Sequence, residues 1–124
     1  MSTVLIVEDN EKNMKLARDV LQAKGYQTLE AITGEDGVKL AKEKKPDLVL
    51  MDIQLPGING IEAFKQIRGE ATTARIPVVA LTASVTPTDR SAITAAGFDA
   101  FVGKPINLKE FLETVKRLIE GGRK

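Results

Sequence analysis

Short apolar segments alternate with segments of helical periodicity along the whole chain, and this alternation limits the fold more than any other feature. Runs rich in valine, isoleucine and leucine predict strands at residues 4–7, 48–52 and 76–81, and a short run with two phenylalanines predicts one at 98–102. A more polar run predicts a further strand, at an edge of the sheet, at residues 26–32. Apolar side chains at spacings of three and four predict helices at residues 11–24, 33–44, 59–68, 86–96 and 107–120. Strict alternation predicts an α/β fold, in which helices cover both faces of a five-stranded parallel sheet.

The composition excludes several classes of protein. The chain has 124 residues and a net charge of +1, with no cysteine and no histidine. This length, without a linker or repeat, predicts a single domain over residues 1–124. The missing residue types exclude disulfides, thiol catalysis, Ser-His-Asp chemistry and the usual zinc sites. The charge suggests neither nucleic acid nor membrane binding, and there is no signal peptide or membrane-spanning run, so we expect a cytoplasmic protein.

Polar residues follow the predicted strands, and their position relative to each strand decides which of them meet. In a parallel sheet all C-terminal strand ends lie at the same edge, where α/β proteins bind their ligands. The residues that this rule brings together are Glu8, Asp9, Asp52, Thr82, Ser84 and Lys104. Asp47 and Asp99 stand at the beginnings of strands, so we expect them at the opposite edge.

The side chains at the shared edge suit phosphoryl transfer. Crowded carboxylates repel one another, and a divalent cation relieves this repulsion; an all-oxygen site suits Mg²⁺. Lys104 offers a point charge for a phosphoryl oxygen, while the Thr82 hydroxyl and the backbone amides near Gln54 and Ala83 offer hydrogen-bond donors. A carboxylate nucleophile at Asp52, together with Mg²⁺, a lysine and a hydroxyl, predicts formation of an acyl phosphate on aspartate.

Each of these residues also has an ordinary structural interpretation. A Glu-Asp pair after a strand is typical of a helix start, and an aspartate near Pro-Gly is typical of a turn. Thr82 suits a strand, Lys104 a solvated surface, and Phe101 the core. Taken singly, these interpretations are favoured. The joint placement at the ends of four separate strands favours the functional site.

Three predicted helices carry more specific expectations. Asn59 is expected to cap a helix that buries Ile61, Phe64 and Ile67. The helix at residues 86–96 has a strong Thr-Pro-Thr-Asp start, but its apolar side chains beyond that start are only alanines and Ile93, so we expect the core to hold it weakly. The last helix has the clearest apolar stripe, formed by Leu108, Phe111, Leu112, Val115, Leu118 and Ile119.

Four motifs at these positions resemble those of response-regulator receiver domains. They are Val4-Leu5-Ile6-Val7-Glu8-Asp9-Asn10, Met51-Asp52-Ile53-Gln54-Leu55-Pro56-Gly57, Leu81-Thr82-Ala83 and Gly103-Lys104-Pro105, which occur in the family's order and span the chain. The resemblance implies the flavodoxin-like receiver fold, with strand order 2-1-3-4-5. Segments 7–16 and 111–118 resemble stand-alone, DivK-type cell-division receivers, and similar segments occur in hybrid histidine kinases. A receiver domain excised from a hybrid kinase therefore stays an alternative.

The resemblance implies a role for each residue at the shared edge. Asp52 would accept a phosphoryl group from a phosphohistidine, and the groups that bind this phosphoryl would be Thr82, Ala83 and Lys104. The implied Mg²⁺ ligands are Asp9, Asp52, the Gln54 carbonyl and, directly or through water, Glu8.

The resemblance also implies a switch between two states. Thr82 would move toward the phosphoryl group, and Phe101 would rotate into the space that it leaves. Phe101 stands where many receivers carry tyrosine, so it lacks the hydroxyl that could mark the switched state by a hydrogen bond. Gln54 and Ser84 occupy the positions that tune hydrolysis in the family, and neither is acidic, so we expect slow loss of the phosphoryl group.

Partners are implied as well. A histidine kinase or histidine phosphotransferase would bind the helix at residues 11–24, and a downstream protein would bind the surface formed by residues 86–96, 98–102 and 107–120. No effector domain follows in the sequence, so protein–protein contact is the expected output. We expect a monomer or weak dimer. We expect no enzymatic activity other than catalysis of its own phosphorylation and dephosphorylation.

Three other classes share the architecture or part of the site. A flavin- or nucleotide-binding module would need a Gly- or Ser/Thr-rich loop after the first strand, where this chain is acidic. A Mg²⁺-dependent aspartyl-phosphate phosphatase would need a second acid two residues past the nucleophile, where Gln54 stands. A scaffold without the chemistry would not need every acid, the hydroxyl and the lysine, all of which are present.

Overall fold

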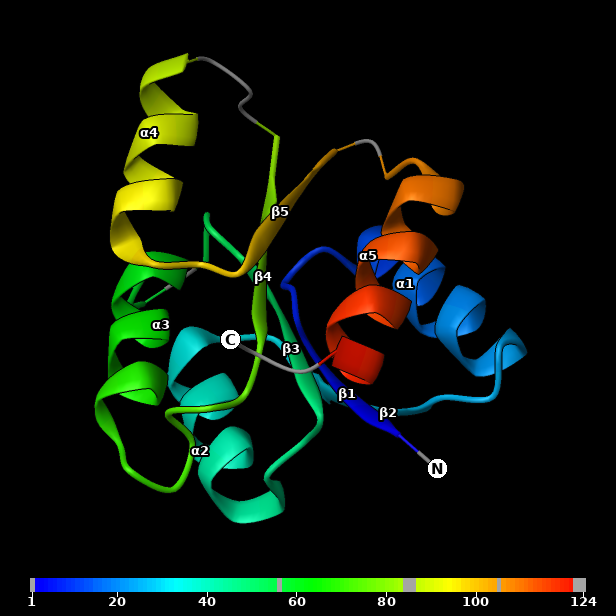
Figure 1. Cartoon of the computed structure of the whole chain (residues 1–124), viewed down its shortest axis with the longest axis horizontal. Helices are drawn as coiled ribbons and strands as arrows, with labels where there is room; N and C mark the ends of the chain where they lie inside the picture. Colours follow the sequence, from blue (N-terminus) through cyan, green and yellow to red (C-terminus); the bar gives the residue numbers. More distant parts are fainter. Residues whose placement is uncertain (1, 56, 84–86, 105, 122–124) are drawn as a thin grey trace.

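Strands and helices alternate strictly in the fold (Figure 1). The computed structural model describes residues 2–55, 57–83, 87–104 and 106–121, apart from the side chain of Asp89. The strands are β1 (Thr3–Val7), β2 (Gln27–Ala31), β3 (Leu48–Asp52), β4 (Val78–Thr82) and β5 (Ala100–Gly103). The helices are α1 (Glu11–Ala23), α2 (Gly34–Lys44), α3 (Gly60–Gly69), α4 (Pro87–Ala96) and α5 (Leu108–Gly121).

The five strands form one parallel sheet in the order β2-β1-β3-β4-β5, which confirms the predicted topology. Every residue of β3 and β4 is buried, whereas the edge strands β2 and β5 are only partly buried. Helices on both faces bury the central strands completely, so these strands are continuously apolar rather than alternating.

Two apolar layers flank the sheet. In Figure 1, α1 and α5 lie on one side of the strands, and α2, α3 and α4 on the other. Successive residues of a strand point to opposite faces, so Val4 and Ile6 join the first layer, while Leu5 and Val7 join the second. The helix residues of the first layer are Met14, Ala17, Leu21, Phe111 and Val115, and those of the second are Val38, Ala41, Ala63, Phe64 and Ile67.

Side-chain caps fix where four helices begin. In each, an oxygen on the residue before the helix accepts a hydrogen bond from the backbone N–H three residues later. The cap and donor pairs are Asn10 with Asn13 (3.1 Å), Thr33 with Asp36 (3.1 Å), Asn59 with Glu62 (2.9 Å) and Asn107 with Glu110 (3.1 Å). Helix α4 begins at Pro87, where a missing N–H costs nothing; Thr86, its predicted cap, lies outside the described residues.

Two predicted core residues are wrong. Because the Asn59 cap starts α3 at Gly60, the buried stripe runs through positions 60, 63, 64 and 67, and Ile61 lies beside it, half-buried. Leu108 is 45% exposed, because it stands in the first turn of α5 at the edge of the sheet, while Phe111 and Val115 are buried.

Four predicted strands also differ at their ends; β1 begins at Thr3, one residue earlier than predicted. β2 is shorter than predicted, and Ile32 beyond it is 61% exposed. β4 begins at Val78, because Pro77 has no N–H for the ladder. β5 begins two residues late, at Ala100, because the Phe98 ring stacks on Phe64 with 4.1 Å between the ring centroids.

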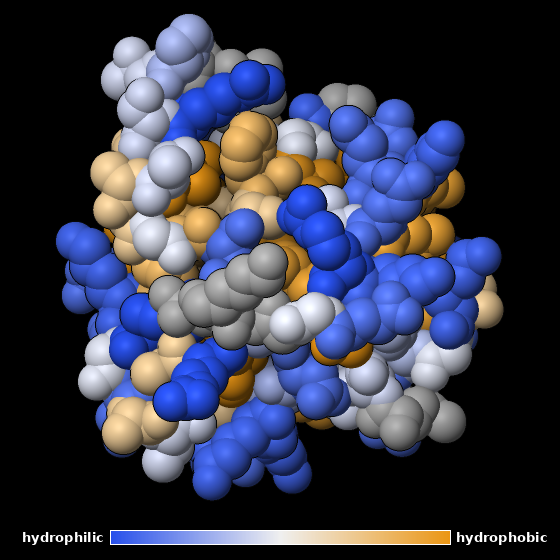
Figure 2. Space-filling model, in the orientation of Figure 1, coloured by the Kyte–Doolittle hydropathy of each residue, from blue (hydrophilic) through white to orange (hydrophobic). Residues whose placement is uncertain are grey.

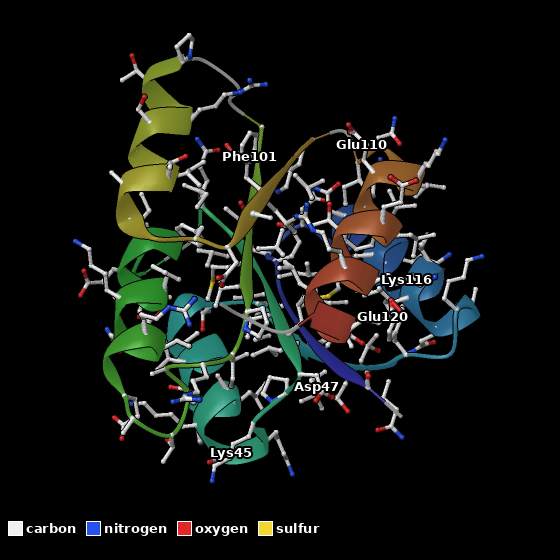
Figure 3. The ribbon with its side chains drawn as sticks, viewed as in Figure 1. Lys45, Asp47, Phe101, Glu110, Lys116 and Glu120 are labelled. Atoms are coloured by element: carbon white, nitrogen blue, oxygen red, sulfur yellow. The ribbon has the colours of Figure 1, made fainter. Side chains whose placement is uncertain are left out.

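The N-terminal strand ends hold the two aspartates that were predicted there. Asp47 accepts a hydrogen bond from the Thr3 N–H at 2.7 Å, and Asp99 accepts one from the Val78 N–H at 2.8 Å. Figure 3 shows Asp47 at the opposite end of the molecule from Phe101. Within the described ranges, none of the helices is long and apolar enough to cross a membrane.

Candidate functional site

Three carboxyl groups meet at the C-terminal edge of the sheet, as predicted. Glu8 and Asp9 follow β1 directly, and Asp52 is the last residue of the neighbouring strand β3. Each offers a carboxylate oxygen, and these oxygens lie within 4.8 Å of one another. Asp9 is exposed, whereas Glu8 and Asp52 are only 1% and 4% exposed. The cluster therefore has two buried acids and one that faces solvent.

Lys104 reaches into this cluster from the end of β5. Its backbone N–H donates to the Thr82 carbonyl at 2.8 Å, which continues the β4–β5 ladder by one residue. Its Nζ lies 3.0 Å from Asp52 Oδ2 and 2.6 Å from Glu8 Oε1. The Asp52 contact is a hydrogen bond, whereas the Glu8 contact is an ion pair without favourable hydrogen-bond geometry. One ammonium group thus bridges two buried carboxyls.

This arrangement shifts the pKa values of two groups. Burial, followed by a hydrogen bond with Asp52, raises the pKa of Glu8 from 4.5 to about 7, although Lys104 acts in the opposite direction. Burial acts to lower the pKa of Lys104, but its contacts with Glu8 and Asp52 outweigh burial and raise it. The lysine therefore stays charged, and Glu8 is the acid that keeps its proton up to neutral pH.

The chain around Asp52 fixes the orientation of its carboxylate. The Gln54 N–H donates to Asp52 Oδ1 at 3.0 Å, while Lys104 binds the other oxygen. The Ile53 N–H donates to the Leu81 carbonyl at 3.0 Å, so the ladder between β3 and β4 continues past Asp52. Both carboxylate oxygens of Asp52 are therefore held.

Thr82 and Ala83 lie where β4 ends, next to the end of β3. Thr82 is buried and stands opposite Gly103 of β5, one residue before Lys104. Asp52 stands opposite Leu81, so the Thr82 position is one residue beyond the acid in the ladder. Ala83 is exposed at the site edge, and Ser84, the third predicted residue of this segment, lies outside the described residues.

Phe101 lies on β5 and is half-buried rather than in the core. The Arg90 guanidinium of α4 lies 5.3 Å from the centroid of its ring, a cation–π geometry. Both line a hollow of about 770 Å³ between α4 and α5, with Lys104, Glu110, Glu113 and Arg117 among its other walls. Figure 2 shows hydrophobic residues between these helices on this face, and hydrophilic residues over α5. Sequence reasoning missed Arg90, because nothing in the sequence pairs it with a residue of β5.

The acid cluster fits a hard divalent cation. All its donors are oxygens, and burial, together with the neighbouring Asp52, raises the pKa of Glu8, so a divalent cation would favour its ionised form. Glu8, Asp9 and Asp52 would hold Mg²⁺, and the predicted Gln54 carbonyl follows Asp52 in the same segment. In the structure, the two buried acids, Glu8 and Asp52, contact the Lys104 ammonium.

The known proteins that this chain resembles agree with the geometry. A model of the response regulator receiver domain matches residues 4–116. The chain belongs to the response regulator receiver family. It is 45% identical to the polar-differentiation response regulator DivK of Brucella anthropi over 92% of this chain and 93% of that protein. DivK of Brucella abortus gives the same identity and coverage.

Solved receivers share the fold. The receiver domain of a Pseudomonas aeruginosa sensor histidine kinase aligns with a TM-score of 0.90 and 31% identity, over 96% of this chain and 98% of that one. That structure has a magnesium ion coordinated in its active-site cleft. Chemotaxis protein CheY4 of Vibrio cholerae aligns with a TM-score of 0.88 and 26% identity, over 94% of this chain and 98% of that one. The predicted flavodoxin-like receiver fold is therefore confirmed.

Proposed function

We propose that this receiver accepts a phosphoryl group on Asp52 from a histidine kinase or histidine phosphotransferase, and signals by contact with another protein. The observation that carries the proposal is the convergence of Glu8, Asp9, Asp52 and Lys104 at one edge of the sheet. A bound Mg²⁺, as in the Pseudomonas receiver, would supply positive charge against the incoming phosphoryl oxygens. The proposed ligands are Asp9, Asp52, the Gln54 carbonyl and Glu8, directly or through water.

The chain's own residues carry the transfer. An Asp52 carboxylate oxygen forms a bond to phosphorus, and the bond from phosphorus to the donor imidazole nitrogen breaks, with its electron pair returning to the ring. Lys104 exchanges its contact with Asp52 for a phosphoryl oxygen, so its charge stays paired throughout. The Thr82 hydroxyl and the Ala83 N–H donate to the remaining oxygens. The chain thus catalyses only its own phosphorylation and dephosphorylation.

The output follows from the place of Thr82 and Phe101. When Thr82 turns toward the phosphoryl group, it leaves space next to β5, and Phe101 moves from its half-buried position into this space. Phe101 lines the hollow between α4 and α5, so its movement repacks the surface formed by α4, β5 and α5. A downstream protein that binds the repacked surface reads the state of Asp52. Phe101 and Thr82 are therefore the proposed switch residues.

The proposed partners and setting follow the family. The phosphodonor contacts α1, which begins at Glu11 next to the acid cluster, and the reaction takes place in the cytoplasm. The similarity to DivK favours a role in polar differentiation and the cell cycle. The acting species is a monomer or weak dimer, and one chain supplies the acid cluster by itself. Neither nucleic acid nor a membrane takes part.

The test is phosphorylation by a small donor. The protein is incubated with acetyl phosphate and Mg²⁺, and its intact mass is measured over time. One added phosphoryl group, absent in Asp52→Asn and absent with a chelator, is the expected result. No adduct on the wild-type protein would refute the proposal. Steady release of inorganic phosphate with rapid turnover would instead identify an aspartyl-phosphate phosphatase.

A further inference from the structure

The segment that follows Asp52 is tied at both ends. The Ile53 carbonyl accepts a hydrogen bond from the Gly60 N–H at 3.0 Å, which joins the end of β3 to the start of α3. Gly60 lies so close to the Asp52 carbonyl that a Cβ at this position would collide with it. Gln54, whose N–H binds the Asp52 carboxylate, lies in the segment between these ties. Its conformation therefore affects the site directly.

The first turn of α2 contacts Gly57 and Ile58, which lie just before the Gly60 end of this segment. A Cβ on Gly34 would lie 2.7 Å from both Cγ1 and the carbonyl oxygen of Ile58. The neighbouring Glu35 places its carboxylate over Gly57, where a Cβ would lie 2.6 Å from Oε2. Gly34, the first residue of α2, is buried. The close approach of α2 to Ile58 explains why a glycine stands at this position.

We propose that the first turn of α2 is a positioning element for the phosphorylation site. Through the contact of Gly34 with Ile58, and the contacts of Gly60 with Asp52 and Ile53, it positions the Gln54 N–H and carbonyl relative to Asp52. The role rests on the proposed function of Asp52. Gly34 touches no reacting atom; it acts through Ile58 on groups that must be held to a fraction of an ångström.

The matched pair Gly34→Ala and Gly69→Ala tests this role. Both substitutions add one methyl group at the end of a helix, but a Cβ on Gly69 has no atom within 4 Å. We expect Gly34→Ala to weaken Mg²⁺ binding, titrated with the metal alone, by about ten-fold or more, and to slow phosphorylation by acetyl phosphate similarly. The backbone amide NMR signals of Asp52 and Gln54 shift in Gly34→Ala. Gly69→Ala leaves all three measurements at their wild-type values.

A second variant keeps the test decisive if Gly34→Ala does not fold. Ile58→Ala removes Cγ1 and Cδ1 from the same contact at a half-buried position, and thermal unfolding verifies that it folds. We expect weaker Mg²⁺ binding in Ile58→Ala too. Wild-type Mg²⁺ affinity, phosphorylation rate and Asp52 and Gln54 signals in the folded variants would overturn the proposal. If the wild-type protein takes no phosphoryl group, the proposed function fails, and the Asp52 and Gln54 signals alone decide whether α2 positions this segment.

Discussion

At the scale of single residues, the main feature of the site is one ammonium group that contacts two buried carboxyl groups. Lys104 contacts Glu8 and Asp52, and this leaves the trio with more negative than positive charge when both acids are ionised. Burial of Glu8, and then its proximity to Asp52, raise its pKa to about 7. A cation that binds here replaces the Glu8 proton, so proton release and metal binding are linked at Glu8.

Glu8 makes stability depend on pH when no metal is bound. Its folded-state pKa of about 7 lies above the ordinary value of 4.5, so the folded protein binds the extra proton between these values. We expect the free energy of unfolding to fall as the pH rises through this window. Denaturant titrations in chelator, across a pH series, measure this slope. The slope should flatten in Glu8→Gln; an equal slope in both proteins would show that another group titrates.

Arg68 is a partly buried charge at the opposite edge of the sheet. Its Nη1 donates to the carbonyls of Ala74 and Ile76 at 2.6 and 2.9 Å, and its Nη2 pairs with Asp99 at 2.8 Å. Asp99, which stands just before β5, also accepts a hydrogen bond from the first N–H of β4. The Arg68–Asp99 pair therefore connects α3, β4 and the start of β5.

Removing Arg68 leaves a largely buried carboxylate with reduced compensation. We therefore expect Arg68→Met to lower the free energy of unfolding by about 3 kcal/mol, measured by denaturant titration. The control is Lys42→Met, which breaks the exposed pair with Glu70, at 3.7 Å, and should change stability by less than about 1 kcal/mol. Equal effects in the two variants would contradict the role given to Arg68.

At the scale of elements, α4 is held mainly through its C-terminal half. Ile93 is buried and Ala96 half-buried, whereas the described side chains before Ile93 are exposed. Beyond the helix, Gly97 adopts a φ of 103° and leads into the Phe98 ring, which stacks on Phe64. The N-terminal half of α4 approaches β5 through the Arg90 guanidinium over Phe101. Such an element can shift with little loss of packing.

The contact of Arg90 with Phe101 should bias the switch. Arg90→Met removes an exposed cation–π interaction, worth about 0.5–1 kcal/mol, that favours the half-buried ring position. We expect the Phe101 ring signals, assigned with Phe101→Leu, to shift in the unphosphorylated variant toward those of the phosphorylated protein. Arg117→Met, on the other wall of the hollow, is the control. Unchanged ring signals in Arg90→Met would show that Arg90 does not hold the ring.

The sequence alone supports much of this level of description, but not all of it. The residues at the shared edge follow from alternation, because parallel strands have only one C-terminal edge. The strand order follows only from the resemblance to receiver domains. The burial of Ile61 and Leu108 was wrong, because each depends on where a cap starts its helix relative to the sheet. Arg90 and the Gly34–Ile58 contact could not be predicted, because they join elements whose relative distance only the folded chain sets.

At the scale of the whole molecule, one edge of the sheet is structural and the opposite edge carries the candidate site. At the N-terminal edge, Asp47 and Asp99 accept hydrogen bonds from strand N–H groups, and Arg68 donates one to Asp99; these bonds fix the strand starts. The C-terminal edge gathers the acids, Lys104 and Thr82, and leads through Phe101 to the hollow between α4 and α5. The proposed phosphorylation at this edge would therefore change the surface above it while the opposite edge stays fixed.

The central claim is that Asp52 forms the acyl phosphate. The most direct measurement is reductive trapping: the protein is treated with acetyl phosphate and Mg²⁺, then with borohydride, which converts an aspartyl phosphate to homoserine, and its peptides are sequenced by mass spectrometry. Conversion at position 52 alone, lost when Mg²⁺ is removed, is the result that we predict. Conversion at Asp9 or another acid, or none under any condition, would contradict it.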